Sequence, residues 1–260
     1  MKLTGERPIE GVTPDSLLAL HAAGYREVAE RIGDGLFLDI GCGLGEGTAQ
    51  FASPGRQLVG ADYDPETAAA ARDGHREIRL VTFCGDGEAL GLRGDVFDHV
   101  CSSHLIEHFV KPAVHVREVA RVLSPAGSAF FITPNAPADF ENPFHVSLFE
   151  PRELRETLEA HFADVDVLGL DATQVVKTDF ERRRETARRL LRLDVFDLRH
   201  RLPRSWFVAL HGFGRRVAYR VLARQQSEGN SGITADEFYL TSDIDPSTLV
   251  LFAVARKPLR

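Results

Sequence analysis

The chain has 260 residues, with 31 Lys and Arg against 38 Asp and Glu for a net charge of −7. This length is enough for one well-buried α/β domain with an insertion, or for two small domains. No apolar run approaches the ~20 residues of a membrane span and the N-terminus has no signal-peptide core, so we expect a cytoplasmic protein.

A helical stripe of apolar residues predicts a first helix over 15–32. Strands and helices then alternate, which is typical of a parallel sheet with right-handed crossovers. The expected strands are 36–40, 57–61, 79–83, 97–102, 128–133, 165–170 and 249–255, the last one antiparallel at an edge. The expected helices are 45–52, 64–72, 111–123 and 151–161. The fold class is therefore α/β, a seven-stranded and mostly parallel sheet with a helical insertion before the last strand.

The three cysteines are too few for a disulfide framework, and they lack the spacing of a metal site. Cys42, Cys84 and Cys101 each fall near the end of an expected strand. We interpret them as small buried residues in a reducing compartment.

Positive charge concentrates between residues 177 and 224, which hold one Lys and 13 Arg against five acidic residues, a net charge of +9. Helices are expected over 181–193 and 203–224. We divide the chain into an N-terminal helical segment or lid (1–32), a core (33–170 with 232–260) and a basic helical insertion (171–231).

Three interpretations of the basic helices stay open. They can be the solvated face of a lid, a clamp for a phosphate or carboxylate on a small-molecule acceptor, or a contact with an anionic membrane surface. The negative overall charge argues against a nucleic-acid partner. The oligomeric state is left open.

The most specific motif follows the first expected strand, where an acid precedes a glycine turn: Asp39, Gly41, Gly43 and Gly45. The glycines permit positive φ angles and close approach of the backbone to a ligand. A dinucleotide site would need Gly-x-Gly-x-x-Gly, but Glu46 and Thr48 hold the positions that this spacing requires. Because Asp39 and Glu46 would also repel a phosphate, the turn favours a ligand with a cationic amino group, such as S-adenosylmethionine (SAM).

The next three strands end in polar residues that can complete such a site. Asp62 ends the second strand, where an acid can accept hydrogen bonds from ribose hydroxyls. Asp86 follows the third strand and can accept from an exocyclic amine such as that of adenine. The fourth strand ends in Ser102, Ser103 and His104. Since the carboxyl ends of parallel strands share one edge, where open α/β folds bind ligands, we expect a single site there.

These motifs, in this order, resemble those of the class I SAM-dependent methyltransferases, which have a Rossmann-like fold. The run from Asp39 to Gly45 resembles their first motif, Asp62 their ribose-binding acid, and Tyr63 the residue that packs on adenine. The resemblance extends over residues 30–170 and the final strand. Around residues 121–127 it departs from the family pattern at Ser124 and Ala126. It implies these cofactor-binding residues: Asp39, Gly41, Cys42, Gly43, Gly45, Asp62, Tyr63, Asp86, Gly87, Ser102, Ser103 and Tyr25.

The N-terminus resembles that of a bacterial subgroup of these enzymes, through Thr-Gly-Glu-Arg at 4–7 together with His21 and Tyr25. The segment 142–145 recurs in such methyltransferases. The resemblance implies a small-molecule acceptor such as a sugar, a glycoside or another secondary metabolite. An anionic acceptor would follow from the basic helices, if they form a clamp.

Methyl transfer from SAM is an in-line displacement, and positioning of the acceptor alone can contribute ~7–11 kcal/mol. A general base adds ~10²–10⁴-fold and is needed mainly for hydroxyl acceptors. His104, His145 and His108 are the candidate bases, although each can instead be a hydrogen-bonded structural residue. Glu107 can simply fix the loop after the fourth strand, and His21 can lie over the cofactor. No metal ligands are predicted.

The sequence therefore predicts an enzyme that moves a methyl group from SAM to a small-molecule hydroxyl, releasing S-adenosylhomocysteine. The alternatives are N-methylation and a lipid-linked acceptor. A different class of function also stays open, a non-catalytic SAM-binding protein that works as a regulator or partner.

Overall fold

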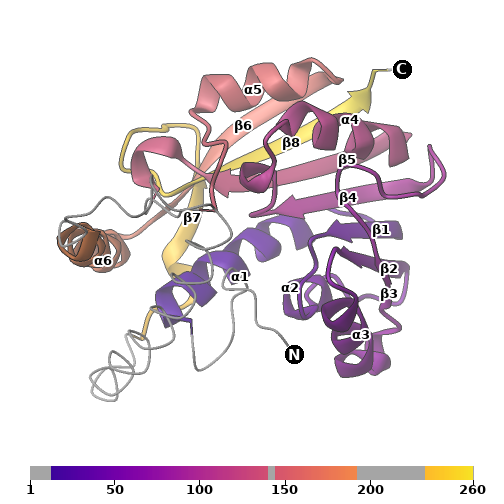
Figure 1. The fold of residues 1–260 in the computed structure, drawn as a ribbon, viewed down its shortest axis with the longest axis horizontal. Coiled ribbons are helices and arrows are strands. Elements are labelled where there is room, and N and C mark those ends of the chain that lie inside the picture. Colours follow the sequence, from indigo (N-terminus) through magenta and orange to yellow (C-terminus); the bar gives the residue numbers. More distant parts are fainter. Residues whose placement is uncertain (1–12, 140–143, 192–231, 260) are drawn as a thin grey trace.

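A computed structural model describes residues 13–139, 144–191 and 232–259 of the chain. Figure 1 shows one central sheet with helices on both of its faces. The strands follow the order β3-β2-β1-β4-β5-β8-β6-β7 across the sheet. In chain order they are β1 (Gly35–Ile40), β2 (Arg56–Asp62), β3 (Val81–Cys84), β4 (Phe97–Ser103), β5 (Leu123–Pro134), β6 (Phe162–Ala172), β7 (Phe238–Thr241) and β8 (Val250–Pro258).

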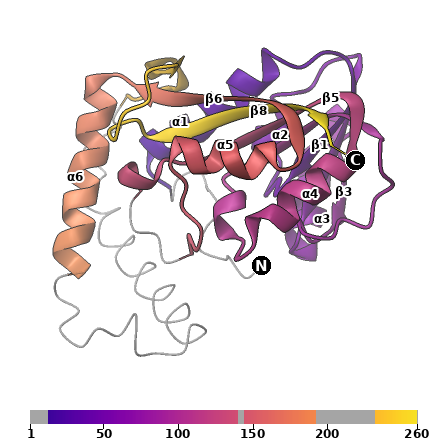
Figure 2. The same ribbon diagram turned by 90° about the horizontal axis from the view of Figure 1, so that it is seen from above.

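The two faces of the sheet are covered by different helices, as the view from above shows (Figure 2). The longer helices are α1 (Asp15–Ala29), α3 (Pro65–Gly74), α4 (Pro112–Val122), α5 (Pro151–Glu159) and α6 (Gln174–Leu191), and α2 (Glu46–Ala49) is a single turn. One apolar core lies under α4 and α5 and includes Val116 and Leu154. The other lies under α1 and includes Ala23 and Val28.

The parallel half of the sheet creates the edge on which a site was expected. β1 pairs in parallel with β2 and β4, β2 with β3, and β4 with β5. Their carboxyl ends therefore form one edge, at Ile40, Asp62, Cys84, Ser103 and Pro134. The predicted α/β fold class, with a mostly parallel sheet, is confirmed.

The sheet differs from the expectation in two respects. It has eight strands, because the short β7 pairs antiparallel with β6. The final strand β8 is antiparallel as predicted, but it lies inside the sheet between β5 and β6 and not at an edge. Residues 250–255 are all buried, and an unbroken apolar run of this kind is typical of a strand covered on both faces.

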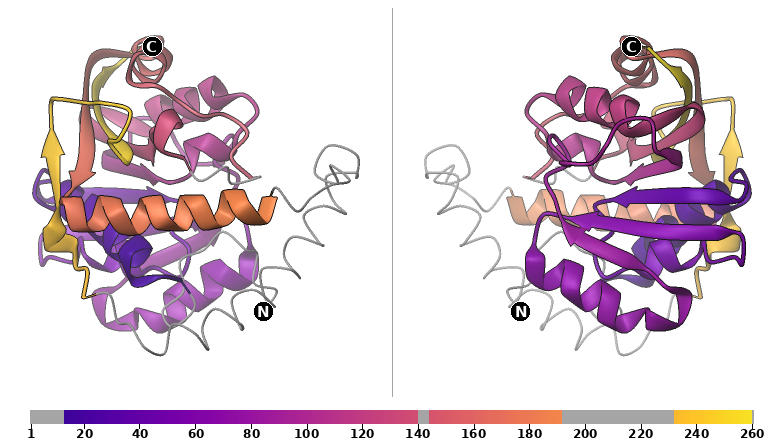
Figure 3. Two further views of the ribbon diagram at one scale, coloured as in Figure 1. Left: turned by 90° about the vertical axis from the view of Figure 1, so that its left-hand side faces the viewer. Right: turned by 90° about the vertical axis from the view of Figure 1, so that its right-hand side faces the viewer.

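The helix expected over 181–193 starts earlier, at Gln174. Val176 and Phe180 in its first turns are buried in the same core as α1, so these turns belong to the packed body of the protein. Figure 3 shows α6 running along the side of the molecule where the parallel strands end. The second expected helix, 203–224, lies outside the described residues.

The cysteines agree with the prediction at two of three positions. Cys42 and Cys101 are buried, whereas Cys84 is exposed, because β3 is an outer strand of the sheet. None of the three forms a disulfide with another cysteine of the described residues. Within the described ranges, we find no helix that is both long and apolar enough to cross a membrane.

Candidate functional site

The loop after β1 is shaped by glycines with positive φ angles, 79° at Gly41, 57° at Gly43 and 92° at Gly45. A Cβ atom on Gly45 would lie 2.7 Å from the ring of His75, whereas a Cβ on Gly43 would meet nothing within 4 Å. The Gly43 backbone therefore borders open space at the carboxyl edge of the sheet. This geometry allows a ligand to approach the main chain closely.

Asp62 lies beside this turn and is held by two main-chain hydrogen bonds. The N–H of Gly43 donates to its Oδ2 (3.2 Å), and the N–H of Asp64 donates to its Oδ1 (2.9 Å). These two contacts orient the carboxylate beside the turn. The next residue, Tyr63, has 63% of its surface exposed. An acid and an exposed aromatic ring thus stand together at the end of β2.

The ends of β3 and β4 provide further polar groups, and those of β4 point to different faces of the sheet. Asp86 is exposed, and its Oδ1 accepts a hydrogen bond from the N–H of Glu88 (2.9 Å). The Ser103 hydroxyl is buried and has no hydrogen-bond partner in the described part of the chain. The neighbouring Ser102 hydroxyl lies 2.8 Å from Nε2 of His115 on α4. Since adjacent strand residues point to opposite faces, Ser102 and Ser103 do not face the same space.

His115 is a residue that the sequence analysis did not single out. Its Nδ1 lies 2.8 Å from the carbonyl oxygen of Gly87, so its ring joins the end of β4 to the turn after β3. Burial lowers the pKa of His115 to about 4, and the ring is therefore neutral at physiological pH. The signal in the sequence was its position beside Val116 and Val119 in a helix whose apolar face is buried.

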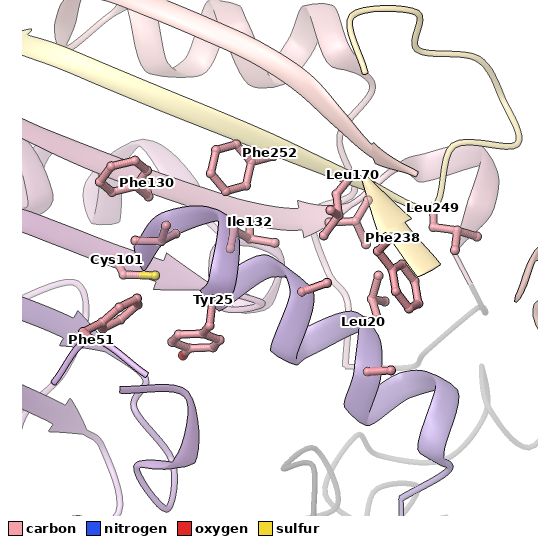
Figure 4. Packing of buried hydrophobic residues seen from close by; sticks show 14 of the residues in the cluster. Leu20, Tyr25, Phe51, Cys101, Phe130, Ile132, Leu170, Phe238, Leu249 and Phe252 are labelled. Carbon is pink, nitrogen blue, oxygen red and sulfur yellow. The ribbon is translucent and has the colours of Figure 1, made fainter. Parts of the chain in front are cut away.

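Asp39 lies beneath the glycine turn and is fully buried. The hydroxyls of Thr48 (2.5 Å) and Tyr25 (3.2 Å) donate to its Oδ2. Burial raises the pKa of Asp39 to about 7, and these two hydrogen bonds oppose the increase. Tyr25 extends from α1 toward the turn, next to Phe51 (Figure 4). Asp39 of β1 is therefore linked to α1 and α2 by these hydrogen bonds. It supports the glycine turn from beneath.

Cys42, the remaining residue of the turn, is buried. A Cβ atom on Gly60 of β2 would lie only 2.8 Å from Cys42 Sγ. The cysteine side chain thus fills the space that Gly60 leaves, which keeps the turn close to β2.

Gly47→Ala is expected to lower the free energy of unfolding by about 1–3 kcal/mol, the usual cost of overpacking. The added Cβ would lie 2.4 Å from Cζ of Tyr25 and would displace the ring that reaches Asp39. Gly74→Ala is the matched control, because a Cβ there meets nothing within 4 Å. Urea unfolding of both variants checks this, and equal losses of stability would contradict it.

His104 follows β4 directly and has a left-handed conformation, with φ of 50°. Its ring centroid lies 4.2 Å from that of His21 on α1. Burial lowers the pKa of His21, and the charge of His104 lowers it further. The Nε2 atom of His104 is buried without a hydrogen-bond partner in the described ranges. An unusual backbone conformation in a non-glycine residue is often found at functional sites.

Glu107 lies at the centre of a group formed with His104, His108 and His145, called the histidine group below. It is fully buried in the turn η2 (Ile106–His108), and its Oε2 accepts a hydrogen bond from Thr133 (3.0 Å). Its Oε1 lies 3.5 Å from Nδ1 of His104. Burial tends to raise the pKa of Glu107, but the contact with His104 and the charges of His108 and His145 lower it overall.

His108 and His145 approach the same carboxylate. One ligand atom from each of them and one from Glu107 all lie within 4.8 Å of one another. His108 Nδ1 lies 3.1 Å from the carbonyl oxygen of Phe144, and His145 Nδ1 lies 2.7 Å from Oδ1 of Asp139. The structure thus brings the three predicted histidines together around Glu107. Asp139 was missed, since nothing in the sequence places it beside His145.

The order of the strands separates two halves of the site. The glycine turn, Asp62 and Asp86 lie at the ends of β1, β2 and β3, on one side of β4. The histidine group lies at the ends of β4 and β5, on the other side. Asp98 is at the opposite edge, where it accepts from the N–H of Leu36 (2.9 Å). This hydrogen bond supports the start of β4.

Comparisons with known proteins agree with this architecture. Residues 38–131 match a family model described as a methyltransferase domain. The structure superposes on the [4+2]-cyclase SpnF with a TM-score of 0.56 at 19% identity, covering 92% of this chain and 82% of that one. The core therefore has the methyltransferase fold.

Two further proteins extend the comparison of this methyltransferase-fold core. A Mycobacterium tuberculosis protein named "Probable S-adenosylmethionine-dependent methyltransferase" is 32% identical over 178 residues, which cover 65% of this chain. The match spans 64% of that relative, just under two thirds of its length. Phosphoethanolamine N-methyltransferase 2 of Haemonchus contortus, solved with S-adenosylhomocysteine, has a TM-score of 0.55 at 19% identity and covers 90% of this chain and 52% of that one.

The resemblance to class I SAM-dependent methyltransferases is therefore supported for the matched domain and for the fold. The narrower subgroup rests partly on residues 4–7, which lie outside the described residues, and stays a prediction. The division into lid, core and insertion, and the roles of individual site residues, also stay predictions.

Proposed function

We propose that this protein is a SAM-dependent methyltransferase that acts on a hydroxyl group of a small molecule. The observation that carries the proposal is the pairing of the glycine turn with Asp62. Open space lies over Gly43, and the Asp62 carboxylate is fixed beside it by the Gly43 N–H. The domain match over residues 38–131 supports the same function.

The residues at this edge fit SAM better than a dinucleotide. Asp62 would bind the ribose hydroxyls, Tyr63 would pack on the adenine, and Asp86 would accept from its amino group. The buried, unpaired hydroxyl of Ser103 is a further polar group at the edge. α2 has only four residues and begins with Glu46, which makes it a poor site for a phosphate.

The chemistry at the other half of the site suits an acceptor with an exchangeable proton. SAM supplies a methyl group that is already activated on a sulfonium. This chain would align the acceptor and exclude water, and His104 Nε2 would take up the acceptor proton. Its burial without a hydrogen-bond partner among the described residues supports this role, and His145 is the second candidate.

α6 supports an acceptor with negative charge. Two hydrogen bonds tie α6 to segments on either side of the carboxyl edge. Ser16 of α1 donates to Asp179 of α6 (2.8 Å), and Arg184 of α6 donates to the carbonyl oxygen of Ala138, which follows β5. The helix thus brings the start of the basic block next to the acceptor side. Membrane contact through 181–224, which was left open, involves mainly residues outside the described ranges and stays a prediction.

Two alternatives have a specific observation in their favour. The Haemonchus contortus neighbour is named as an N-methyltransferase, so nitrogen acceptors belong in any screen. The SpnF neighbour is named as a cyclase, which shows that this fold does not by itself determine the reaction. A screen for methyl transfer from labelled SAM to nucleotide sugars, glycosides, amines or lipid extracts distinguishes the alternatives from the proposed hydroxyl acceptor. SAM binding without transfer to any acceptor would favour a non-catalytic protein.

Asp62→Asn is expected to weaken SAM binding by about 10–100-fold. Hydrogen bonds to a charged group contribute about 1.5–3 kcal/mol, and each 1.4 kcal/mol corresponds to about tenfold in affinity. Asp98→Asn is the control, an identical change at the opposite edge of the sheet. Calorimetric titration with SAM and with its demethylated product measures both. A wild-type protein that binds neither compound would refute the proposed function.

A further inference from the structure

We propose that Glu107, His108 and His145 form a binding site for one divalent transition-metal cation of the Zn²⁺ type, on the acceptor side of the edge. The sequence predicted no metal ligands, and the proposal departs from that expectation. The first observation is convergence, since one ligand atom from each of the three lies within 4.8 Å of the other two. Metal–ligand distances near 2.0–2.2 Å require only a small closure of these side chains.

The second observation is the state of Glu107. This carboxylate is fully buried, and its Oε2 accepts a hydrogen bond from Thr133. Its Oε1 is buried and makes no hydrogen bond in the described part of the chain, although Nδ1 of His104 lies 3.5 Å away. A buried carboxylate oxygen without a hydrogen bond is costly. A cation between the histidines would satisfy this oxygen.

The third observation is the support behind each ligand. Metal-bound histidines commonly donate their other ring N–H to a carboxylate or a carbonyl oxygen, which fixes the ring orientation. Here His145 Nδ1 lies 2.7 Å from the Asp139 carboxylate, and His108 Nδ1 lies 3.1 Å from the Phe144 carbonyl. Ligation through Nε2 would keep both hydrogen bonds. Thr133 orients Glu107 by donating a hydrogen bond to its Oε2.

The ligand set indicates the class of metal. Imidazole suits Zn²⁺, Fe²⁺, Cu²⁺ and Ni²⁺, whereas Mg²⁺ and Ca²⁺ prefer oxygen ligands. Two histidines and one glutamate are also the protein ligands of many catalytic zinc sites, which keep a further position open for water or substrate. Methyl transfer changes no oxidation state, so a redox-inactive cation is sufficient.

The position of the three ligands suggests that the cation would bind the acceptor, and this part of the inference rests on the proposed function. The three ligands follow β4 and β5, next to His104 and away from the ribose-binding acid. An oxygen of the acceptor at the open position would be held beside the histidine group. The cation would thus select acceptors with a hydroxyl or carbonyl oxygen that can coordinate a metal.

The test is a titration of the full-length, chelator-treated protein with Zn²⁺, in the absence of SAM. We expect one tight site per chain. Glu107→Gln and the double change His108→Ala with His145→Ala should each lower the affinity by 100-fold or more. Asp139→Asn should lower it by about 10–100-fold, the usual effect of losing the support behind a metal ligand. His161→Asn, which removes a histidine elsewhere on the molecule, should leave it unchanged.

Two further measurements decide between explanations. Cys84 is an exposed thiol, so Zn²⁺ binding that survives the double histidine change and disappears in Cys84→Ser would overturn the proposal. The SAM affinity of each variant shows that it is folded. A wild-type protein that binds SAM but not Zn²⁺ refutes the metal site alone. One that binds Zn²⁺ at these residues but not SAM supports the site and refutes the proposed function.

Discussion

Asp39→Asn is expected to stabilise the cofactor-free protein by up to about 4 kcal/mol at pH 8, and to change its stability little near pH 4. The carboxyl group is fully buried, and burial raises its pKa from 3.8 to about 7. Each pKa unit corresponds to about 1.36 kcal/mol. Burial of the ionised group is therefore expected to cost the native state up to about 4 kcal/mol.

The sign follows from proton binding. Between pH 4 and pH 7 the native state keeps a proton on Asp39 that the unfolded chain has already released. Stability therefore falls as pH rises through this window, and above pH 7 the loss is complete. Asn cannot ionise, and its amide oxygen can still accept hydrogen bonds from Thr48 and Tyr25. The difference between variant and wild type should accordingly grow from pH 4 to pH 8.

Urea unfolding at several pH values measures this difference directly. Asp98→Asn, the same change at an exposed site on the opposite edge, serves as the control and should show no comparable trend. A difference for Asp39→Asn that stays constant from pH 4 to pH 8 would contradict the expectation. The same titration with SAM present should reduce the advantage of Asn, if the charge of Asp39 helps to hold a cationic ligand.

His104→Gly is expected to lower the turnover number by about 10²–10⁴-fold, the usual contribution of a general base. Its affinity for SAM should change only a few-fold, because the histidine lies on the acceptor side of β4. Glycine is chosen because the φ of 50° at this position suits it better than alanine. The relief of backbone strain, ~1 kcal/mol or more, should offset the lost contact with His21.

Turnover is measured with the acceptor that the labelled-SAM screen identifies, and SAM affinity by calorimetry. His145→Ala is tested in parallel, since it is the second candidate base and also a proposed metal ligand. His161→Asn should retain full turnover. Unchanged turnover in both His104→Gly and His145→Ala would remove the base hypothesis.

The sequence was informative wherever function depends on the ends of strands. The period of the apolar residues located the strands, and parallel pairing then placed Asp39, Asp62 and Asp86 on one edge without knowledge of any side-chain contact. The alternation of side chains along β4 could also have shown that Ser102 and Ser103 point to opposite faces.

Other features depended on contacts that sequence patterns do not encode. β7 has four residues, too few for a recognisable period. The interior position of β8 results from the return of β6 and β7 beyond it. The group around Glu107 combines side chains from η2 with His145, 37 positions further along the chain. Their separation is set by the path of β5, and no motif spacing would have revealed it.

The contact between Tyr25 and Asp39 has a consequence for how this protein can be divided. α1 carries the ring that caps the acid beneath the glycine turn, and its Ala23 and Val28 are fully buried. A fragment that begins at residue 33 would lose both the cap and the cover of an apolar face. Chimeras that exchange the N-terminal segment between relatives should therefore take Tyr25, Asp39 and Thr48 from the same parent protein.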